Sequence, residues 1–222
     1  MSETLPLFPL GTVLYPGLLL PLHIFEDRYR QLVRDLLDGP EPRRFGVIAI
    51  RTGRETGVDG VSALYEIGCT ATLRRVVEHE DGRFDLVTAG AQRFRLAGLD
   101  HSKPYLQGDV ALLPEDTGDD AAAAVAMEAV QRGFGDYRQA LAKRGAGAVG
   151  TIEMPDDPVQ LSYLVAASIV VDLRDHQTLL AQPDALHRLE AERAILARET
   201  AMLRTFTSAP APGLRNAPWN PN

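Results

Sequence analysis

The hydrophobic pattern of this chain changes its period near residue 116, and that change limits the folds open to it. Before this point apolar and polar side chains alternate, as in the segment Ile67–Leu73, and a period of two is typical of a half-buried strand. After it, apolar residues recur three and four positions apart, as at positions 127, 130, 134, 137 and 141, which is the period of one helix face. The sequence therefore predicts an α+β fold, with a β-rich subdomain over residues 1–115 and an α-helical subdomain over residues 119–206.

The β-rich part is divided into short pieces by turn-forming residues. Prolines and glycines between positions 6 and 17 separate three expected strands, Leu5–Leu7, Thr12–Leu14 and Leu18–Leu22. Phe45–Ile50 is expected to form another strand, and the dipeptide Asp81-Gly82 predicts a type I′ hairpin. Many short strands with frequent turns predict a small barrel or a curled sheet.

One helix is expected inside the β-rich part. Phe25, Tyr29, Leu32 and Leu36 repeat at helical spacing, and Gly39-Pro40 supplies a stop signal. These four apolar side chains are expected to share one buried face.

The second half reads as helical. Residues 116–120 are polar and resemble a hinge, and Gly133 and Gly135 suggest close packing of the helix that contains them. Asp157-Pro158 is a strong helix start for an apolar helix over 159–171. Further helices are expected over 175–182 and from about position 184, the last with a leucine stripe at 189, 196 and 203 that could pack internally or against a partner. Residues 207–222 contain four prolines and are expected to be a flexible tail.

Charge argues against nucleic acid and membranes as partners. Residues 1–115 carry 13 Lys+Arg and 16 Asp+Glu, and residues 116–222 carry 10 and 14, so both parts are acidic and together give the net charge of −7. Binding to phosphate backbones or to anionic lipids depends on positive charge. We therefore expect no binding to nucleic acid or to a membrane.

Cysteine usage and hydropathy suggest a cytoplasmic protein. Cys69 is the only cysteine, so no intrachain disulfide can form, and its apolar surroundings predict a buried thiol. The apolar runs are much shorter than the roughly 20 residues that span a bilayer. Residues 1–4 lack the basic region of a secretory signal.

The sequence contains no convincing motif for a catalytic site or for a cofactor-binding site. A G-x-G-x-x-G match at Gly145, Gly147 and Gly150 follows a helix instead of a strand, and we interpret it as a helix terminator and linker. The five histidines show no zinc-type spacing, so no metal is expected. His23 is interpreted as a core histidine with a backbone partner. No residue is predicted to be catalytic, cofactor-binding or metal-binding.

Several segments together resemble the amino-terminal domain of Lon proteases. The opening run through Pro16 to Phe25, the strand Tyr65–Cys69, the hairpin, and the G-x-x-R-F run from Gly90 through Arg93-Phe94 all carry the resemblance. It extends over roughly residues 5–205 and is most specific in the opening run. Pro16, Phe25, Gly68 and Phe94 match it, and their expected roles are in turns and in the core.

The resemblance implies a barrel of the pseudouridine-synthase-and-archaeosine-transglycosylase (PUA)-like type followed by a helical bundle, and a domain that recognises unfolded or tagged polypeptides. The chain ends where a Lon protease would continue into its ATPase and protease domains, so the expectation is a bacterial stand-alone domain without their activities. The expected function is a non-enzymatic polypeptide-binding module that acts as an adaptor in protein quality control and can self-associate. The alternative is a small-molecule-sensing domain or a hydrolase with an unrecognised site. The peptide-binding residues are not identifiable from the sequence.

Overall fold

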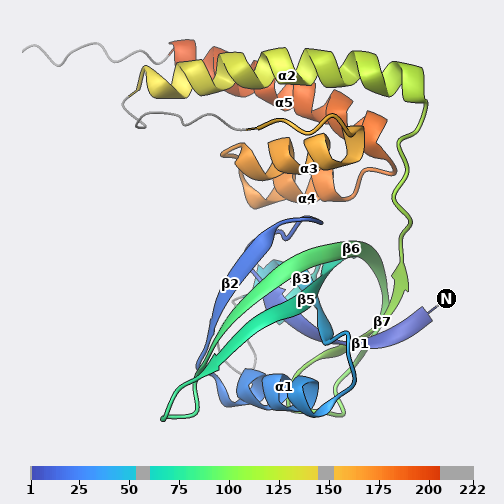
Figure 1. The fold of residues 1–222 in the computed structure, drawn as a ribbon, viewed down its shortest axis with the longest axis vertical. Helices are drawn as coiled ribbons and strands as arrows, with labels where there is room; N and C mark the ends of the chain where they lie inside the picture. The colour runs from blue at the N-terminus through green and yellow to red at the C-terminus, as the bar shows by residue number, and fades with distance from the viewer. Residues whose placement is uncertain (1, 54–60, 145–152, 206–222) are drawn as a thin grey trace, which may run out of the picture.

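The protein is built as two lobes joined by one connecting segment (Figure 1). The computed structural model describes residues 2–53, 61–144 and 153–205. The β lobe contains β1 (Ser2–Leu10), β2 (Leu19–Ile24), α1 (Asp27–Asp38), β3 (Arg44–Gly53), β4 (Val61–Leu64), β5 (Ile67–Glu78), β6 (Phe84–Asp100) and β7 (Gln107–Leu112). The helical lobe contains α2 (Asp120–Ala142), α3 (Pro158–Ser168), α4 (Leu173–Leu180) and α5 (Ala185–Thr205). The α+β fold predicted from the change of period is confirmed.

The strands of the β lobe close into a barrel. They pair in the order β1-β7-β6-β5-β3, and β1 pairs again with β3 through Leu7–Leu10, which closes the ring. The other pairings in the ring are antiparallel, while β1 and β3 run parallel. β2 pairs with the first half of β6, and β4 pairs with β3. The long strand β6 thus reaches both β2 at one end and β7 at the other.

Two apolar clusters stabilise the β lobe. One lies inside the barrel and includes Leu7, Ile48 and Phe94. The other lies between the sheet and α1, which covers the end of the barrel away from the helical lobe (Figure 1). Tyr29, Leu32, Val33 and Leu36 bury the inner face of α1, as predicted. Phe25 does not, because α1 starts two residues later and the Phe25 side chain is 53 % exposed.

The first strands differ from the prediction. β1 runs unbroken through Pro6 and Pro9, whereas Thr12–Leu14 forms no strand. The β5–β6 hairpin is present, but its turn is not type I′. Gly82 has a φ of 77° and donates from N to His79 O at 2.8 Å, while the non-glycine residues described, Asp81 among them, have no positive φ. This pattern is a three-residue loop in which only the glycine takes the left-handed conformation.

The helical lobe follows its predicted caps and apolar faces. Asp157 caps α3 by accepting from Gln160 N at 2.8 Å, with Pro158 in the first turn. α3 ends at Ser168, earlier than the pattern suggested. α5 packs along α2, and Leu189 and Leu196 are buried between the helices, so this part of the leucine stripe packs internally. Of the two glycines of α2, Gly133 lies near Leu196, whereas Gly135 faces open space.

The segment between the lobes is tied down and does not behave as the expected hinge. Asp116 O accepts from Ala185 N at 2.9 Å, and Thr117 O accepts from Leu186 N at 3.0 Å. These bonds satisfy amide groups at the start of α5, which have no partner within the helix. Both lobes are therefore connected through the first turn of α5.

Candidate functional site

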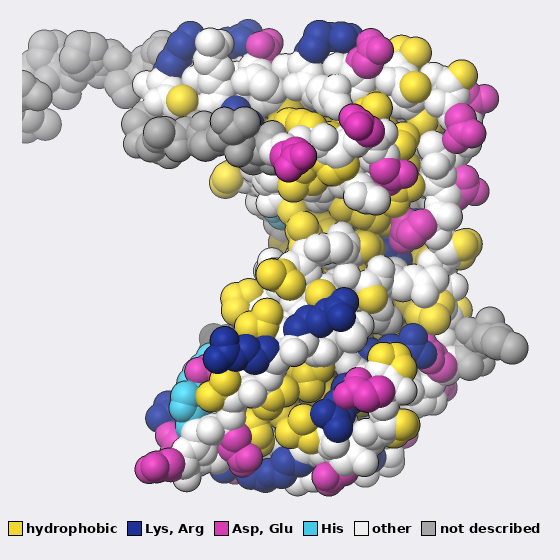
Figure 2. Space-filling view, viewed as in Figure 1, with side chains coloured by type: hydrophobic (Ala, Val, Ile, Leu, Met, Phe, Trp, Pro, Cys, Tyr) yellow, Lys and Arg dark blue, Asp and Glu magenta, His cyan; other side chains and the backbone are white. Residues whose placement is uncertain are grey.

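The seam between the two lobes is the candidate site. α3 and α4 lie between the α2–α5 pair and the barrel (Figure 1), and the molecule is hollowed on one side at this level (Figure 2). Tyr15 and Ile67 come from the β lobe, yet they belong to the same apolar cluster as Leu161, Leu180 and Leu196 of the helical lobe. The hydrophobic core of the helical lobe thus continues across the seam.

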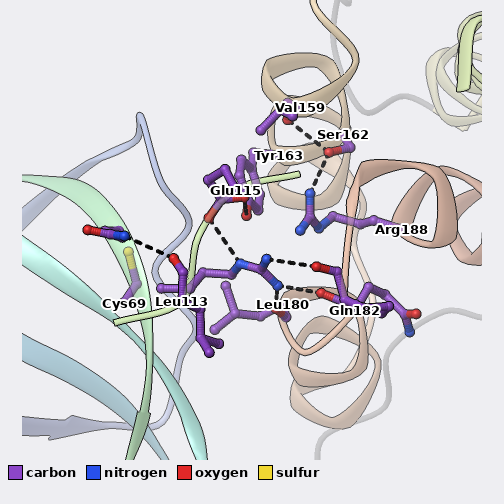
Figure 3. Close-up of polar contacts among 12 residues, drawn as sticks. Cys69, Leu113, Glu115, Val159, Ser162, Tyr163, Leu180, Gln182 and Arg188 are labelled. Carbon is purple, nitrogen blue, oxygen red and sulfur yellow. Dashed lines mark hydrogen bonds and ion pairs between the residues drawn. The ribbon is translucent and has the colours of Figure 1, made fainter. Parts of the chain in front are cut away.

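Arg93 of β6 is the central polar contact of the seam. Its side chain is only 2 % exposed. The guanidinium donates from Nη1 to Leu180 O at 3.0 Å and to Gln182 O, from Nη2 to Pro183 O at 3.3 Å, and from Nε to Glu115 Oε1 at 3.1 Å. Figure 3 shows three of these partners, Glu115, Leu180 and Gln182, close to one another at the seam. A strand residue therefore satisfies the carbonyl groups at the carboxyl end of α4, which lack helical partners.

Glu115 extends this network into α3. Its second oxygen, Oε2, accepts from Tyr163 OH at 2.5 Å. Burial raises the pKa of the Tyr163 hydroxyl, so it remains a neutral donor. Arg188 of α5 stacks on the Tyr163 ring, with Cζ 3.9 Å from the ring centroid, and donates to Ser162 Oγ at 2.8 Å. Buried charges are paired or stacked here, as a low-dielectric interior requires.

Two further contacts cross the seam. Tyr15 OH donates to His176 O at 3.0 Å, and burial raises the pKa of this hydroxyl. Burial also lowers the pKa of the His176 side chain, which favours the neutral imidazole. The second contact comes from Gln177 of α4, which donates from Nε2 to Ile67 O at 2.8 Å. The lobes are thus held by hydrogen bonds from both sides.

One cavity at the seam is mostly apolar, and we call it the apolar groove. It measures about 310 Å³ and lies between the turn before β2 and the first turns of α3. Its walls are formed by Pro16, Gly17, Leu18, Glu115, Pro155, Val159, Gln160, Tyr163 and Leu164. Apolar walls with few polar groups are typical of binding cavities.

A second cavity at the seam is charged, and we call it the arginine cleft. It measures about 560 Å³ and lies between the barrel and α4. It is lined by Arg51, Tyr65, Glu66, Ile67, Arg95, Arg174, Gln177, Thr178 and Ala181. Three guanidinium groups and one carboxylate thus share one opening in a protein of net charge −7.

The residues singled out by sequence reasoning have mixed outcomes. Cys69 is fully buried, as predicted, and burial raises its pKa to about 12, so the thiol is protonated at neutral pH. His23 is exposed instead of buried, and its partner is a side chain, with Nδ1 2.6 Å from Asp85 Oδ1. It lies on β2, whose side chains alternate between solvent and interior, and position 23 faces outward. Gly145, Gly147 and Gly150 lie outside the described residues.

The resemblance motifs are explained by packing. Pro16 lies in the turn before β2, Phe94 is buried inside the barrel, and Gly68 is packed against the Phe94 ring. A Cβ at Gly90 would lie 2.2 Å from Tyr15 O, so this position requires glycine. Sequence reasoning missed the role of Arg93, because Arg93 and Arg95 both alternate with apolar residues of β6 and the pattern assigns both to the solvent-facing side.

The helices show no candidate for a membrane span in the part of the chain that the structure describes. Within the same residues, His, Cys, Asp and Glu side chains form no group of three or more placed to hold a metal ion.

Comparisons with known proteins agree with this geometry. The family model of the ATP-dependent protease La (LON) substrate-binding domain matches residues 4–198. Lon protease 2 of Syntrophobacter fumaroxidans is 24% identical over 206 residues, which cover 91% of this chain and 25% of that protein. Lon protease of Escherichia coli K12 is 23% identical over 201 residues, which cover 90% of this chain and 25% of that protein. The chain thus spans about a quarter of the length of these relatives.

Solved structures show the same fold. A Lon N-terminal domain protein from Xanthomonas campestris superposes with a TM-score of 0.61 at 24% identity, covering 88% of this chain and 98% of that one. The N-terminal domain of the Lon protease of the Mycobacterium avium complex superposes with a TM-score of 0.62 at 17% identity, covering 90% and 98%. The chain belongs to the family of the Lon substrate-binding domain.

Proposed function

We propose that this protein is a non-enzymatic module that binds unfolded or tagged polypeptide, acting in protein quality control through a protein partner. The observation that carries the proposal is the match of residues 4–198 to a substrate-binding domain, together with the apolar groove at the seam. We further propose that residues 1–115 and 119–206 are the two subdomains between which the polypeptide binds.

The apolar groove supports an apolar segment as the ligand. Leu18, Val159 and Leu164 are partly exposed on its walls. Covering such surface is favourable by about 25 cal/mol per Å². The ordered network of Arg93, Glu115 and Tyr163 lies behind it, so the groove is supported by fixed side chains and loses little freedom on binding.

The exposed edge of β2 is a second candidate surface for polypeptide binding, but it is less suited to that role. β2 pairs only with β6 among the described strands. Gly90 N donates to Leu18 O at 2.8 Å, and in an antiparallel ladder this places residues 20, 22 and 24 at the positions bonded to β6. Pro21 then faces the free edge with no N–H to offer, which is how natural edge strands resist the addition of another strand.

The groove can be tested with a charged substitution. Val159→Asp places a carboxylate on the groove wall but in the first turn of α3, where the helix dipole tolerates acids. The ligand in the assay is a fluorescent, permanently unfolded protein of near-zero net charge. We expect the variant to bind it at least about tenfold more weakly, because about one buried aliphatic side-chain contact is lost. Fluorescence anisotropy measures this affinity.

Val125→Asp is the matched control, because Val125 is 70 % exposed on α2 and lies outside the groove. Circular dichroism verifies that both variants are folded. Equal affinity of the wild-type protein and Val159→Asp would exclude the groove as the binding surface. If the wild-type chain binds no unfolded polypeptide at all, the proposed function itself fails.

A further inference from the structure

We propose that the arginine cleft binds an extended polypeptide segment that carries acidic side chains, so that the protein selects its ligands by negative charge as well as by apolar content. This inference rests on the proposed function and specifies the class of polypeptide that is bound. It concerns a surface separate from the apolar groove, because the two cavities share no lining residue.

The positive groups of the cleft come from three elements of both lobes. Arg51 lies on β3, Arg95 on β6 and Arg174 on α4. In the described ranges, the Arg51 and Arg174 side chains have no hydrogen bond, ion pair or ring contact. Their guanidinium groups are therefore available to a ligand, and guanidinium donors match carboxylate oxygens in a bidentate geometry.

Glu66 is the acidic residue that lines the cleft, and it neutralises the positive charge of the three arginines only in part. Glu66 Oε2 lies 3.3 Å from Arg95 Nη1, and the two side chains are 80% and 56% exposed. Such solvated pairs contribute little free energy, so a ligand carboxylate can replace Glu66 at a small cost. The remaining two guanidinium groups leave a local positive charge in a chain of net charge −7, and a cleft focuses that charge toward an acidic ligand.

Gln177 places a buried acceptor without a partner in the wall of the cleft. This residue is 4% exposed and lines the cleft. Its Nε2 donates to Ile67 O, which fixes the amide orientation, while Oε1 is buried with no hydrogen-bond partner in the part of the chain that the structure describes. A buried acceptor without a donor costs free energy. A peptide supplies both a carboxylate and backbone N–H groups, whereas a bare anion supplies only the first.

The size and composition of the cleft favour a peptide over RNA. A volume of about 560 Å³ accommodates several residues of an extended chain, well beyond one carboxylate. Tyr65 is the aromatic residue among the lining side chains, and both lobes are acidic in sequence. RNA binding requires a longer positive track with stacking side chains.

The test compares matched peptides and matched variants of the full chain. The probe is a fluorescent peptide of about twelve residues with alternating Glu and Leu, which at about 3.3 Å per residue is longer than the few residues that the cleft accommodates. Its control replaces each Glu with Gln. We expect the acidic peptide to bind at least about tenfold more tightly, from several charge-assisted hydrogen bonds. The double variant Arg51→Gln/Arg174→Gln should remove this preference, and Glu66→Gln should increase it.

Arg132→Gln is the control for the change in net charge, because Arg132 is 72% exposed on α2, pairs with Glu128 and lies outside the cleft. Equal binding of the two peptides by the wild-type chain would overturn the inference while leaving the proposed function intact. Binding of neither peptide would also overturn the inference, whereas the proposed function is decided by the assay with the unfolded protein. Tighter binding of free glutamate, phosphate or a single-stranded RNA than of the acidic peptide would assign the cleft to another ligand. Arg132→Gln removes one positive charge and the double variant removes two, so a loss of preference in Arg132→Gln at least half as large as in the double variant would show an effect of net charge and would also overturn the inference.

Discussion

Glu192 carries a carboxyl group into the interior of the helical lobe. The residue is 0% exposed, and both carboxyl oxygens are without a hydrogen-bond partner among the described residues. Arg188 lies one turn earlier, but its guanidinium donates to Leu179 O at 3.2 Å and to Ser162 Oγ at 2.8 Å. Burial therefore raises the pKa of Glu192 well above its usual range, although the charge of Arg188 partly opposes the shift. Burial thus favours the neutral form of this side chain in the folded protein.

Glu192→Gln should make stability less dependent on pH. An unfolded glutamate has a pKa of about 4.3 and releases its proton above that value, while the folded protein retains it. A raised folded pKa contributes stability that is complete below about pH 4.3 and is lost as the pH rises through the folded pKa. The wild-type free energy of unfolding should fall relative to Glu192→Gln by up to about 1.4 kcal/mol per pH unit in that window.

Urea denaturation at a series of pH values from about 4 upward measures how the free energies of unfolding of the two proteins differ. Glu190→Gln, an exposed position on the same helix, should follow the wild-type curve. Parallel curves for the wild-type protein and Glu192→Gln would contradict the assignment of a neutral buried carboxyl group.

At the scale of elements, the pairing of α2 with α5 organises the helical lobe. α2 buries Val130, Phe134 and Tyr137 against its neighbours, and α5 buries Leu189 and Leu196. This burial holds α2 in a helix despite its two interior glycines, each of which costs about 1 kcal/mol relative to alanine. Packing thus overrides a local preference that weakens the helix.

Gly135→Ala should stabilise the protein by about 1 kcal/mol, because the alanine has the better helix propensity. A Cβ at this exposed position would meet no atom within 4 Å, so the gain is not offset by a clash. Thermal unfolding followed by circular dichroism would show a higher melting temperature. Gly90→Ala is the opposing control, since its Cβ would lie 2.2 Å from Tyr15 O, and a stabilised Gly90→Ala would contradict the packing described here.

At the scale of the whole molecule, Arg93 is the central polar contact between the two lobes. Arg93 donates to the carbonyl oxygens of Leu180, Gln182 and Pro183, which lie at the end of α4 and just after it. It also pairs with Glu115. Because the guanidinium is buried, removing it leaves those carbonyl oxygens and Glu115 Oε1 without a donor, while Glu115 Oε2 keeps Tyr163 OH. The orientation of the lobes, and with it the shape of both cavities at the seam, depends on this residue.

Arg93→Met should lower the free energy of unfolding by about 3–5 kcal/mol, because removing one partner of a buried ion pair leaves the other partner uncompensated. It should also increase proteolytic cleavage in the segment between β7 and α2, because the lobes become less tightly coupled. Chemical denaturation and limited proteolysis measure the two effects. Arg95→Met is the control on the same strand, since Arg95 is 56% exposed, and equal losses in the two variants would refute the coupling role of Arg93.

The sequence by itself determined the α+β class, the inner face of α1, the cap of α3 and the burial of Cys69, because each of these follows from local period, turn chemistry or capping. It could not place His23 or Phe25, since the side of a strand and the first residue of a helix depend on register. The two cavities and the Arg93 network were decided only by the tertiary structure. Their residues come from segments such as β3, β6, α3 and α4, which are far apart along the chain, and no local pattern records which distant side chains meet when a barrel closes and a helical lobe packs onto it.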